Sequence, residues 1–131
     1  MEPEVVDLPD ASTMPPVVGN IRYENVTFSY VPGVDVLKDI NVEFKSGESV
    51  AIVGATGAGK STLVTLAHRF YDVTNGRITV DGYDIREVKR NSLVNQMSMV
   101  LQEPFLFSGT IYENIRYSHL DRSDAEVIDA A

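Results

Sequence analysis

The eight residues from Gly54 to Ser61 constrain this chain more than any other stretch. They read Gly-Ala-Thr-Gly-Ala-Gly-Lys-Ser, so two glycines with four residues between them are followed at once by lysine and serine. The apolar run Ser49–Val53 precedes them and suits a strand buried on both faces. Apolar side chains then recur at helical spacing, namely Leu63, Leu66, Ala67 and Phe70. A strand, a glycine-rich loop and a helix in this order predict a P-loop, a phosphate-binding turn.

The residue types of this loop suit a polyphosphate ligand. Glycine adopts positive φ and has no Cβ, so successive amides from Gly57 to Thr62 are able to point inward as an anion site. The start of the following helix adds unpaired N–H groups and the positive end of its dipole. Lys60 is placed to reach the β- and γ-phosphates, Ser61 to bind Mg²⁺, and Thr62 to donate another hydrogen bond. The predicted ligand contacts are therefore Gly54, Ala55, Thr56, Gly57, Ala58, Gly59, Lys60, Ser61 and Thr62.

The alternative reading of this loop is an ordinary glycine-rich turn between a strand and a helix. With glycine at about 7% of residues in average proteins, the four fixed positions match by chance in under about 1% of chains of this length. The phosphate-binding interpretation is therefore strongly favoured.

Composition excludes several other kinds of site. The chain has 131 residues, enough for a domain with a sizeable core, and it has no cysteine, which excludes disulfides, thiolate zinc sites and cysteine nucleophiles. No apolar run approaches the roughly 20 residues of a membrane span. The net charge of −8 argues against nucleic acid as a partner. This charge is compatible with phosphate binding, because exposed charges more than about 8 Å away are largely screened at physiological salt.

Residues 1–20 differ in character from the rest of the chain. They contain four of the six prolines and four acidic residues, with no lysine or arginine. This composition predicts an extended, acidic and proline-rich linker, and a flexible tail is the alternative. The structured domain is predicted to cover residues 21–131.

Two kinds of sheet are predicted within the structured domain. Strands that alternate apolar and polar side chains are predicted at 21–30, 37–44 and 77–80. They indicate an antiparallel subdomain with one wet face, and a change of parity at Glu24-Asn25 predicts a β-bulge. The mostly apolar run 97–101 is predicted to be a parallel partner of 49–53. The fold class is therefore α/β, with a P-loop NTPase core (a partial parallel sheet with helices) plus an antiparallel β subdomain.

Turn and capping patterns place the remaining elements. Turns are predicted at Pro32-Gly33, Asn75-Gly76 and Asp81-Gly82, a helix at 84–95, and capping boxes at Thr110/Glu113 and Ser123/Glu126. The last predicted helix shows no stop signal before Ala131, and we expect the chain to be a fragment. No run of four apolar residues followed by aspartate occurs after the P-loop, so the acidic residue that P-loop hydrolysis needs for Mg²⁺ is missing from the sequence.

Further motifs occur in the order found in a known family. They are IRYENVTFSY at 21–30, VLKDIN at 36–41, RFYD at 69–72, GRI at 76–78, DGYDIR at 81–86, VLQEP at 100–104, FSGTI at 107–111 and ENI at 113–115. With the P-loop, they make residues 17–131 resemble the N-terminal half of an ABC-transporter nucleotide-binding domain, most closely that of exporters. Val73 and Asn95 stand where the family commonly has proline and a basic residue. The resemblance implies that the sequence is truncated before the Walker B strand, and so lacks the signature loop and the switch histidine as well.

The resemblance also implies roles for residues that the pattern alone leaves as ordinary. Tyr30 would stack on adenine, whereas its pattern alone suits a strand-end aromatic. Gln102 would approach Mg²⁺ and the attacking water, whereas its pattern alone suits a surface residue. Lys60 and Gln102 would then be the catalytic residues of this chain, and Ser61 and Gln102 its metal ligands. The stretch from Phe105 to Tyr112 would face the coupling helix of a membrane domain, or its aromatic side chains would fill a local core.

The function implied is the ATP-binding part of an exporter subunit that couples ATP binding and hydrolysis to transport across a membrane. ATP and Mg²⁺ would be its cofactors. A second nucleotide-binding domain and transmembrane domains would be its partners, at the cytoplasmic face of a membrane, with residues 1–20 leading from a membrane domain. The fragment alone would bind ATP without turnover. The alternatives are a P-loop kinase or GTPase-like enzyme, for which acceptor or base-recognition residues are missing, and a binding-only regulatory module.

Overall fold

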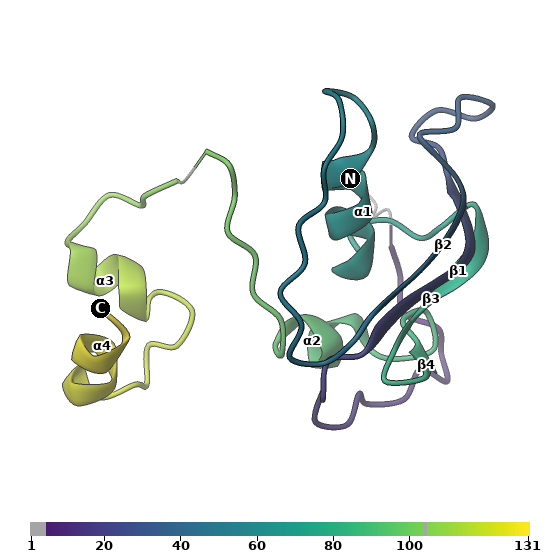
Figure 1. Ribbon diagram of the computed structural model, residues 1–131. Helices are drawn as coiled ribbons and strands as arrows, with labels where there is room; N and C mark the ends of the chain where they lie inside the picture. Colours follow the sequence, from purple (N-terminus) through teal and green to yellow (C-terminus); the bar gives the residue numbers. More distant parts are fainter. Residues whose placement is uncertain (1–4, 104) are drawn as a thin grey trace. The chain divides into compact units, whose positions relative to one another are not determined.

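The computed structural model describes residues 5–103 and 105–131, and these fall into two compact units (Figure 1). Unit 1 extends to Ser98, and unit 2 is Met99–Ala131. Among the described residues, no helix is long and apolar enough to cross a membrane.

A four-stranded antiparallel sheet forms the framework of unit 1, with the strand order β2-β1-β3-β4. The strands are β1 (Ile21–Phe28), β2 (Leu37–Phe44), β3 (Asn75–Val80) and β4 (Tyr83–Asp84). The predicted antiparallel strands are therefore confirmed. β1 lies between β2, the next strand in the sequence, and β3, which follows only after α1.

The predicted bulge in β1 is present. The register with β2 shifts between Tyr23 and Val26, and Asn25 has a φ of 50°. Because the shift changes which side chains face inward, Tyr23 and Val26 are both buried despite their odd spacing. The neighbouring strand has a glycine at this place, Gly76, where a Cβ would lie 2.3 Å from the carbonyl oxygens of Glu24 and Asn25. Gly76 lies within β3, whereas the sequence predicted a turn at Asn75-Gly76.

The β3–β4 hairpin confirms the predicted turn at Asp81-Gly82. Asp81 and Gly82 have φ of 51° and 87°, the two positive values that a tight hairpin turn requires. The predicted helix 84–95 does not begin at Asp84, because Asp84 belongs to β4 and pairs with Thr79 across this hairpin. Only the end of that region is helical, as α2 (Arg90–Val94).

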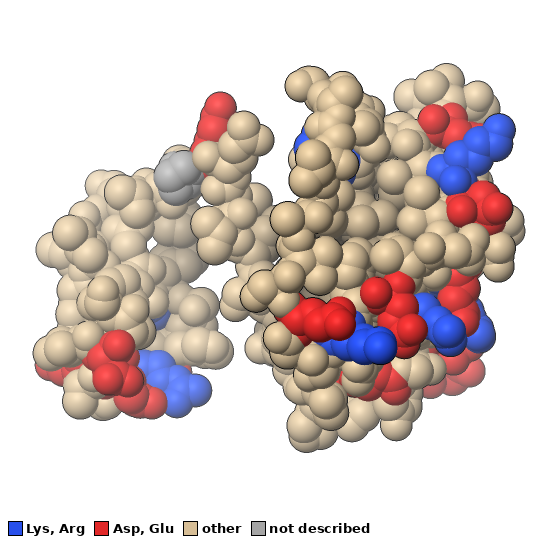
Figure 2. All heavy atoms as spheres, viewed as in Figure 1, with Lys and Arg blue, Asp and Glu red and all other residues tan. Residues whose placement is uncertain are grey.

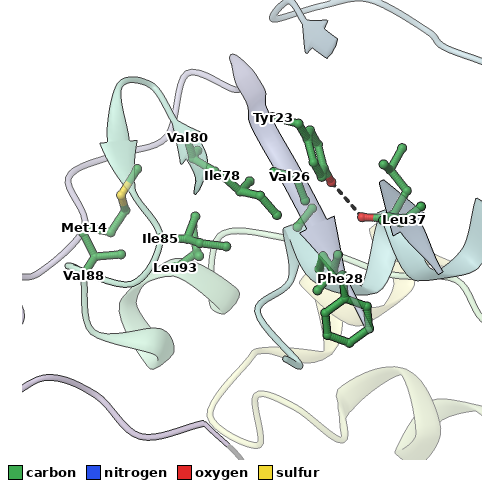
Figure 3. Close-up of a cluster of buried hydrophobic side chains, with 13 residues drawn as sticks. Met14, Tyr23, Val26, Phe28, Leu37, Ile78, Val80, Ile85, Val88 and Leu93 are labelled. Atoms are coloured by element: carbon green, nitrogen blue, oxygen red, sulfur yellow. Dashed lines mark hydrogen bonds between the residues drawn. The ribbon is translucent and has the colours of Figure 1, made fainter. Parts of the chain in front are cut away.

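The core lies between the sheet and the helix α1 (Lys60–Ala67) (Figure 3). Its buried members are Met14, Tyr23, Val26, Phe28, Leu37, Leu63, Leu66, Ala67, Ile78, Val80, Ile85, Val88 and Leu93. The Tyr23 hydroxyl donates a hydrogen bond of 2.7 Å to the carbonyl oxygen of Leu63, which ties β1 to α1 (dashed in Figure 3). Burial raises the pKa of the Tyr23 phenol, so it stays a donor at neutral pH. Phe70, predicted on the buried face, is exposed because α1 ends at Ala67.

The runs 50–53 and 97–101, predicted to pair as parallel strands, are not strands in the part of the chain that the structure describes. Neither run forms a strand there, and Val53 and Val100 are 91% and 97% exposed. A strand exists only where a neighbour pairs with its backbone, and an apolar strand also needs cover on both faces. Neither run has such a neighbour within the described residues. High β propensity alone does not make a strand.

Residues 5–20 pack against the rest of unit 1 although their sequence shows no periodicity. Ala11 and Met14 are buried, and Met14 joins the core cluster. Ser12 forms an isolated parallel bridge with Val88, supported by hydrogen bonds of 3.0 and 2.7 Å to the flanking backbone. The segment is thus held by apolar burial and by backbone pairing, two features that composition does not reveal.

A buried arginine joins this segment to the end of α1. Arg69 is 1% exposed, and its guanidinium donates to the carboxylates of Asp7 and Asp72 at 3.1 Å each and to the carbonyl oxygen of Val88 at 2.9 Å. A buried charge is tolerated only when it is paired and hydrogen-bonded in this way. Arg69 also has a φ of 50°, so the chain reverses directly after the helix.

Asp81 holds the last residues of the N-terminal segment. Its carboxylate accepts hydrogen bonds from the amides of Val18 at 2.6 Å and Asn20 at 2.8 Å, and a longer one from Gly19. Partial burial acts to raise the pKa of Asp81, but these N–H donors outweigh it and hold the pKa below its usual value.

Unit 2 contains two short helices with the predicted capping boxes. They are α3 (Ile111–Arg116), capped by Thr110 and Glu113, and α4 (Asp124–Ala130), capped by Ser123 and Glu126. In each box, the capping side chain accepts a hydrogen bond from the amide of the glutamate, and the glutamate side chain accepts one from the amide of the capping residue. The Phe107 ring stacks on Tyr117 with centroids 4.0 Å apart. Phe107 therefore makes a local aromatic contact, but Phe107 is half-exposed and Phe105 is exposed, so these side chains do not fill a local core as one of the two readings expected.

Acidic and basic side chains are interspersed on the face of unit 1 that Figure 2 shows. Several form partly exposed ion pairs within the sheet, such as those of Arg22 and Arg77 with Glu24. Exposed pairs of this kind contribute roughly 0–1 kcal/mol each. The buried apolar cluster therefore accounts for far more of the stability than the surface charges do.

Replacing Arg69 by methionine should lower the free energy of unfolding by about 2 kcal/mol, because it leaves the buried carbonyl oxygen of Val88 without its donor and removes the ion pairs with Asp7 and Asp72. The matched control is Arg77→Met, since Arg77 pairs with Glu24 but is 57% exposed. We expect a change within about 1 kcal/mol for this control. Urea titration of both variants provides the measurement, and equal effects would contradict the role given to Arg69.

The contribution of Asp81 to stability should depend on pH. A carboxyl whose pKa is depressed in the folded state stabilises the fold fully above its unfolded pKa, about 4. That stability is lost as the pH falls from there through the lower folded pKa. The stability difference between wild type and Asp81→Asn should therefore shrink toward acid, whereas Asp10→Asn, at an exposed carboxyl, should show little difference at any pH. Thermal unfolding between about pH 7 and pH 3 measures this, and a constant difference would contradict it.

Candidate functional site

The predicted P-loop is a curved loop that leads directly into α1. Gly57 and Gly59 have φ of 81° and 83°, and the amide of Ala58 donates to the carbonyl oxygen of Ala55 at 3.2 Å. Gly59 is the N-terminal cap of α1, and its carbonyl oxygen accepts the first helical hydrogen bond from Leu63 at 2.9 Å. Two left-handed glycines thus turn the backbone, as the sequence predicted for this loop.

The amides of this turn are available to a ligand. Within residues 5–103 and 105–131, no protein acceptor receives a hydrogen bond from the backbone N–H of Gly57, Gly59, Lys60, Ser61 or Thr62. The first amides of a helix have no intrahelical acceptor, and α1 has no side-chain cap. Such a set of unpaired donors at the positive end of a helix suits an anion.

Lys60 lies over its own loop. Its ammonium group donates to the carbonyl oxygens of Gly54 at 2.8 Å and Ala55 at 2.7 Å. A lysine has three donors, so this arrangement leaves one N–H of the ammonium free. The charge is held beside the unpaired amides, and its flexible stem allows it to reach an oxygen bound there.

The glycines of the loop serve different purposes. A Cβ on Gly59 would lie 2.7 Å from Cδ2 of Leu37 and 3.2 Å from the carbonyl oxygen of Val36, so β2 approaches the loop closely at this point. A Cβ on Gly57 would meet nothing within 4 Å, so its positive φ alone favours glycine there. Gly54 needs neither feature, because a Cβ there would make only ordinary contact with Ala58 at 3.4 Å.

Tyr30 lies beside the first turn of α1. Its hydroxyl is 3.2 Å from the hydroxyl of Thr62, and either group is able to donate. Its ring makes T-shaped contacts with Phe28 at 4.8 Å and Tyr71 at 5.2 Å between centroids. Tyr30 is 50% exposed, which leaves aromatic surface free for a flat ligand. Two residues predicted to bind the same nucleotide, Tyr30 and Thr62, are therefore brought into contact by the fold.

The proposed metal ligands lie in different units. Ser61 is exposed in the first turn of α1, next to the unpaired amides. Gln102 is an exposed residue of unit 2, in a bend after the run that ends at Leu101. Among the described residues there is no group of three or more histidine, cysteine, aspartate or glutamate side chains that would hold a metal ion. The roles of Ser61 and Gln102 stay predictions.

The stretch after Gln102 contributes exposed aromatic side chains. Phe105 and Phe107 are exposed and contact each other edge to face, with ring centroids 5.2 Å apart. The side-chain amide of Asn114 bonds to the backbone of Phe107 in both directions, at 2.8 and 3.0 Å. Pro104, which belongs to the motif that predicted this region, lies outside the described residues.

Sequence reasoning missed one residue near the site, Tyr71. It follows the P-loop helix in sequence, and its ring lies against Tyr30 and Phe28. The sequence offered one signal for Tyr71, namely a tyrosine shortly after the P-loop helix. Such a signal is too weak to predict a contact. The contact depends on the reversal of the chain at Arg69, which has a φ of 50°.

Comparisons with known proteins identify the family. Residues 37–131 match the ABC transporter family. The chain is 46% identical over 129 residues to the uncharacterized ABC transporter ATP-binding protein YwjA of Bacillus subtilis, covering 98% of this chain and 22% of that protein. It is 45% identical over 133 residues to the fatty acid ABC transporter ATP-binding/permease protein of Mycobacterium tuberculosis, covering 98% and 21%.

A solved structure agrees with these relatives. A bacterial Atm1-family ABC exporter with ATP bound matches 98% of this chain and 23% of its own length, with a TM-score of 0.92 and 41% identity. The chain belongs to the ABC transporter family. It spans about a fifth of the length of the relatives described above. The resemblance inferred from the motifs is therefore confirmed, and membership of this family leaves the kinase or GTPase-like alternative without support.

Replacing Gly59 by alanine should impair the loop more than replacing Gly57. Both changes strain a positive φ, at a cost of about 1 kcal/mol or more, but only a Cβ at position 59 would collide with Leu37. We expect Gly59→Ala to lower the unfolding midpoint and to weaken phosphate binding, and Gly57→Ala to have a clearly smaller effect on the midpoint. Thermal unfolding with and without tripolyphosphate measures both, and equal midpoints would contradict the steric role of Gly59.

Proposed function

We propose that this chain is the ATP-binding part of an ABC exporter subunit, in which ATP binding and hydrolysis drive transport across a membrane. The observation that carries the proposal is the set of unpaired amides of Gly57, Gly59, Lys60, Ser61 and Thr62 at the start of α1, with the Lys60 ammonium bonded to the same loop. The named relatives, which include an ATP-binding/permease protein and an exporter with ATP bound, support the same reading.

In this proposal the P-loop holds the β- and γ-phosphates. The backbone N–H groups donate to phosphate oxygens that carry negative charge, and hydrogen bonds of this kind are roughly twice as strong as neutral ones. Lys60 exchanges at least one of its bonds to Gly54 and Ala55 for a phosphate oxygen. The helix end, the amides and the ammonium group together neutralise a ligand that the net charge of −8 would otherwise disfavour.

Mg²⁺ is proposed to be held by the Ser61 hydroxyl, by phosphate oxygens and by water, with Gln102 as a further ligand. Mg²⁺ suits a site of this kind because it keeps several waters and takes few protein ligands. When bound, it neutralises charge that develops on the phosphate during transfer. Gln102 is proposed to orient the attacking water, and Lys60 to stabilise the charge on the transferred phosphate.

Tyr30 is proposed to bind the base. Its half-exposed ring offers a surface for stacking on adenine, and its contact with Thr62 places it next to the phosphate-binding turn. Because the base and the triphosphate of a nucleotide are joined covalently, their two subsites must lie at a fixed spacing. Thr62 of α1 contacts Tyr30 and so links the two subsites. The family match begins at residue 37, so it does not include Tyr30.

The partners and the location are proposed from the family. A second nucleotide-binding domain would close over the nucleotide, and transmembrane domains would contact the region from Gln102 to Tyr112, at the cytoplasmic face of a membrane. Residues 1–20 would lead from a membrane domain, and residues 21–131 would be part of the nucleotide-binding domain. The Walker B carboxylates, the signature loop and the switch histidine would come from other parts of the transporter.

A binding-only module is the second candidate function. In such a module, nucleotide bound at the same loop would regulate assembly without catalysis. The reading frame on both sides of this sequence separates the two candidates. A Walker B glutamate downstream supports the ATPase, and a substitution at that position supports the regulator.

The 131-residue chain should bind Mg-ATP weakly and should not turn it over. Lys60→Ala should weaken binding at least about tenfold, because an ion pair with a phosphate in a partly desolvated site is lost. Lys45→Ala, at an exposed turn lysine, is the matched control and should bind as the wild type does. Isothermal titration calorimetry and a phosphate-release assay make the measurements.

Two outcomes would contradict these expectations. Equal ATP affinity of wild type and Lys60→Ala would overturn the phosphate site. Multiple-turnover hydrolysis by the pure chain, abolished by Lys60→Ala, would overturn the expectation that the chain needs groups from elsewhere for catalysis.

A further inference from the structure

We propose that Tyr71 is a positioning residue for base recognition, which holds the Tyr30 ring in place and so makes the site select a nucleotide over a bare polyphosphate. This inference rests on the proposed function, because it assumes that Tyr30 binds the base. It adds a residue outside the P-loop and outside the strand that leads to Tyr30.

The first support is the geometry of three aromatic rings. Tyr30 contacts Phe28 with an interplanar angle of 85° and Tyr71 with one of 88°, and Phe28 and Tyr71 contact each other at 5.6 Å between centroids. Edge-to-face contacts at such distances are the favoured arrangement of aromatic pairs. Phe28 is buried and therefore fixed, whereas Tyr30 is half-exposed. Tyr71 thus contacts both the fixed ring and the exposed ring.

The second support is the absence of other restraints on Tyr30. β1 ends at Phe28, so Tyr30 lies beyond the strand that would otherwise fix its backbone. In the part of the chain that the structure describes, its side chain has one polar contact, with Thr62. An exposed aromatic residue with a single hydrogen bond samples several rotamers unless neighbours exclude them. The rings of Phe28 and Tyr71 are the neighbours that do so.

The third support is the place of Tyr71 in the chain. Its position is fixed by the reversal at Arg69, whose amide bonds to the carbonyl oxygen of Leu66 at 3.0 Å and whose side chain is buried. α1 therefore carries the phosphate-binding amides at its start, Thr62 in its first turn, and the connection to Tyr71 at its end. One rigid element sets the spacing between the phosphate subsite and the base subsite.

At position 71 the proposed role depends on the aromatic ring and not on the hydroxyl. The structure gives the Tyr71 hydroxyl no hydrogen-bond partner among the described residues, whereas its ring makes both aromatic contacts. Phenylalanine should therefore replace tyrosine here without loss. Leucine keeps an apolar side chain at this partly buried position but removes the ring, and with it the edge-to-face contact with Tyr30 and the tilted contact with Phe28.

The experiment compares ATP and inorganic tripolyphosphate as ligands of the full 131-residue chain, each with Mg²⁺, by isothermal titration calorimetry. The variants are Tyr71→Leu, Tyr71→Phe and Tyr30→Leu. We expect Tyr71→Leu to weaken ATP binding roughly three- to tenfold, the range that aromatic pair contacts support, with tripolyphosphate binding unchanged. Tyr71→Phe should match the wild type for both ligands, and Tyr30→Leu should abolish the preference for ATP.

The outcomes separate the inference from the function on which it rests. If the wild type prefers ATP and Tyr71→Leu keeps that preference, or weakens both ligands equally, the positioning role is wrong while the phosphate site stands. If Tyr71→Leu fails to fold, as circular dichroism would show, Tyr30→Phe is the second variant. It removes only the hydroxyl bonded to Thr62 and keeps the ring against Phe28 and Tyr71, so its preference for ATP should stay close to that of the wild type. A loss of this preference as large as that of Tyr30→Leu would show that the Thr62 bond, and not the Tyr71 ring, positions Tyr30, and would contradict the inference. If the wild type binds neither ligand, the proposed function itself is wrong and the inference falls with it.

Discussion

The packing of α1 against β1 is the interaction on which the rest of this structure depends. Leu63, Leu66 and Ala67 bury one face of the helix, and the Tyr23 hydroxyl bonds to the carbonyl oxygen of Leu63. An eight-residue helix is too short to be stable alone in water, so this tertiary contact holds it. Because the buried face is fixed, the unpaired amides at the start of the helix stay exposed in a defined direction. The proposed phosphate site is thus a consequence of how the helix is held at its other residues.

The two ends of α1 show how stability and the site are linked. At its start, unpaired N–H groups and Lys60 are left without full partners, which costs stability unless water or an anion binds them. At its end, Arg69 is buried and satisfied by carboxylates and a carbonyl oxygen. One of those carboxylates belongs to Asp7, so the N-terminal segment completes the anchor of the helix. A segment that composition marks as a linker therefore takes part in holding the P-loop helix.

The exposed apolar runs at 49–53 and 97–101 show the opposite situation. Their residues have high β propensity, and Val53 and Val100 still lie almost fully exposed. The backbone of a strand is satisfied only by a neighbouring strand, and propensity does not supply one. In the larger transporter that we propose, these runs would find partners in other parts of the nucleotide-binding domain. Exposed apolar surface of this kind marks a contact face more often than a free one.

The local sequence determined the turns, the caps and the chemistry of the site. Residues that are neighbours in the chain determine the bulge at Asn25, the hairpin turn at Asp81 and both capping boxes. They also determine the P-loop turn, with its two left-handed glycines. Tertiary structure alone decided the contacts between distant residues: Tyr30 with Thr62, Tyr71 with Tyr30, and Arg69 with Asp7. It also decided that the apolar runs stay unpaired and that Asp84 joins a strand. The physical reason is that dihedral preferences and capping hydrogen bonds act within a few residues, whereas burial and strand pairing depend on what the folded chain brings alongside.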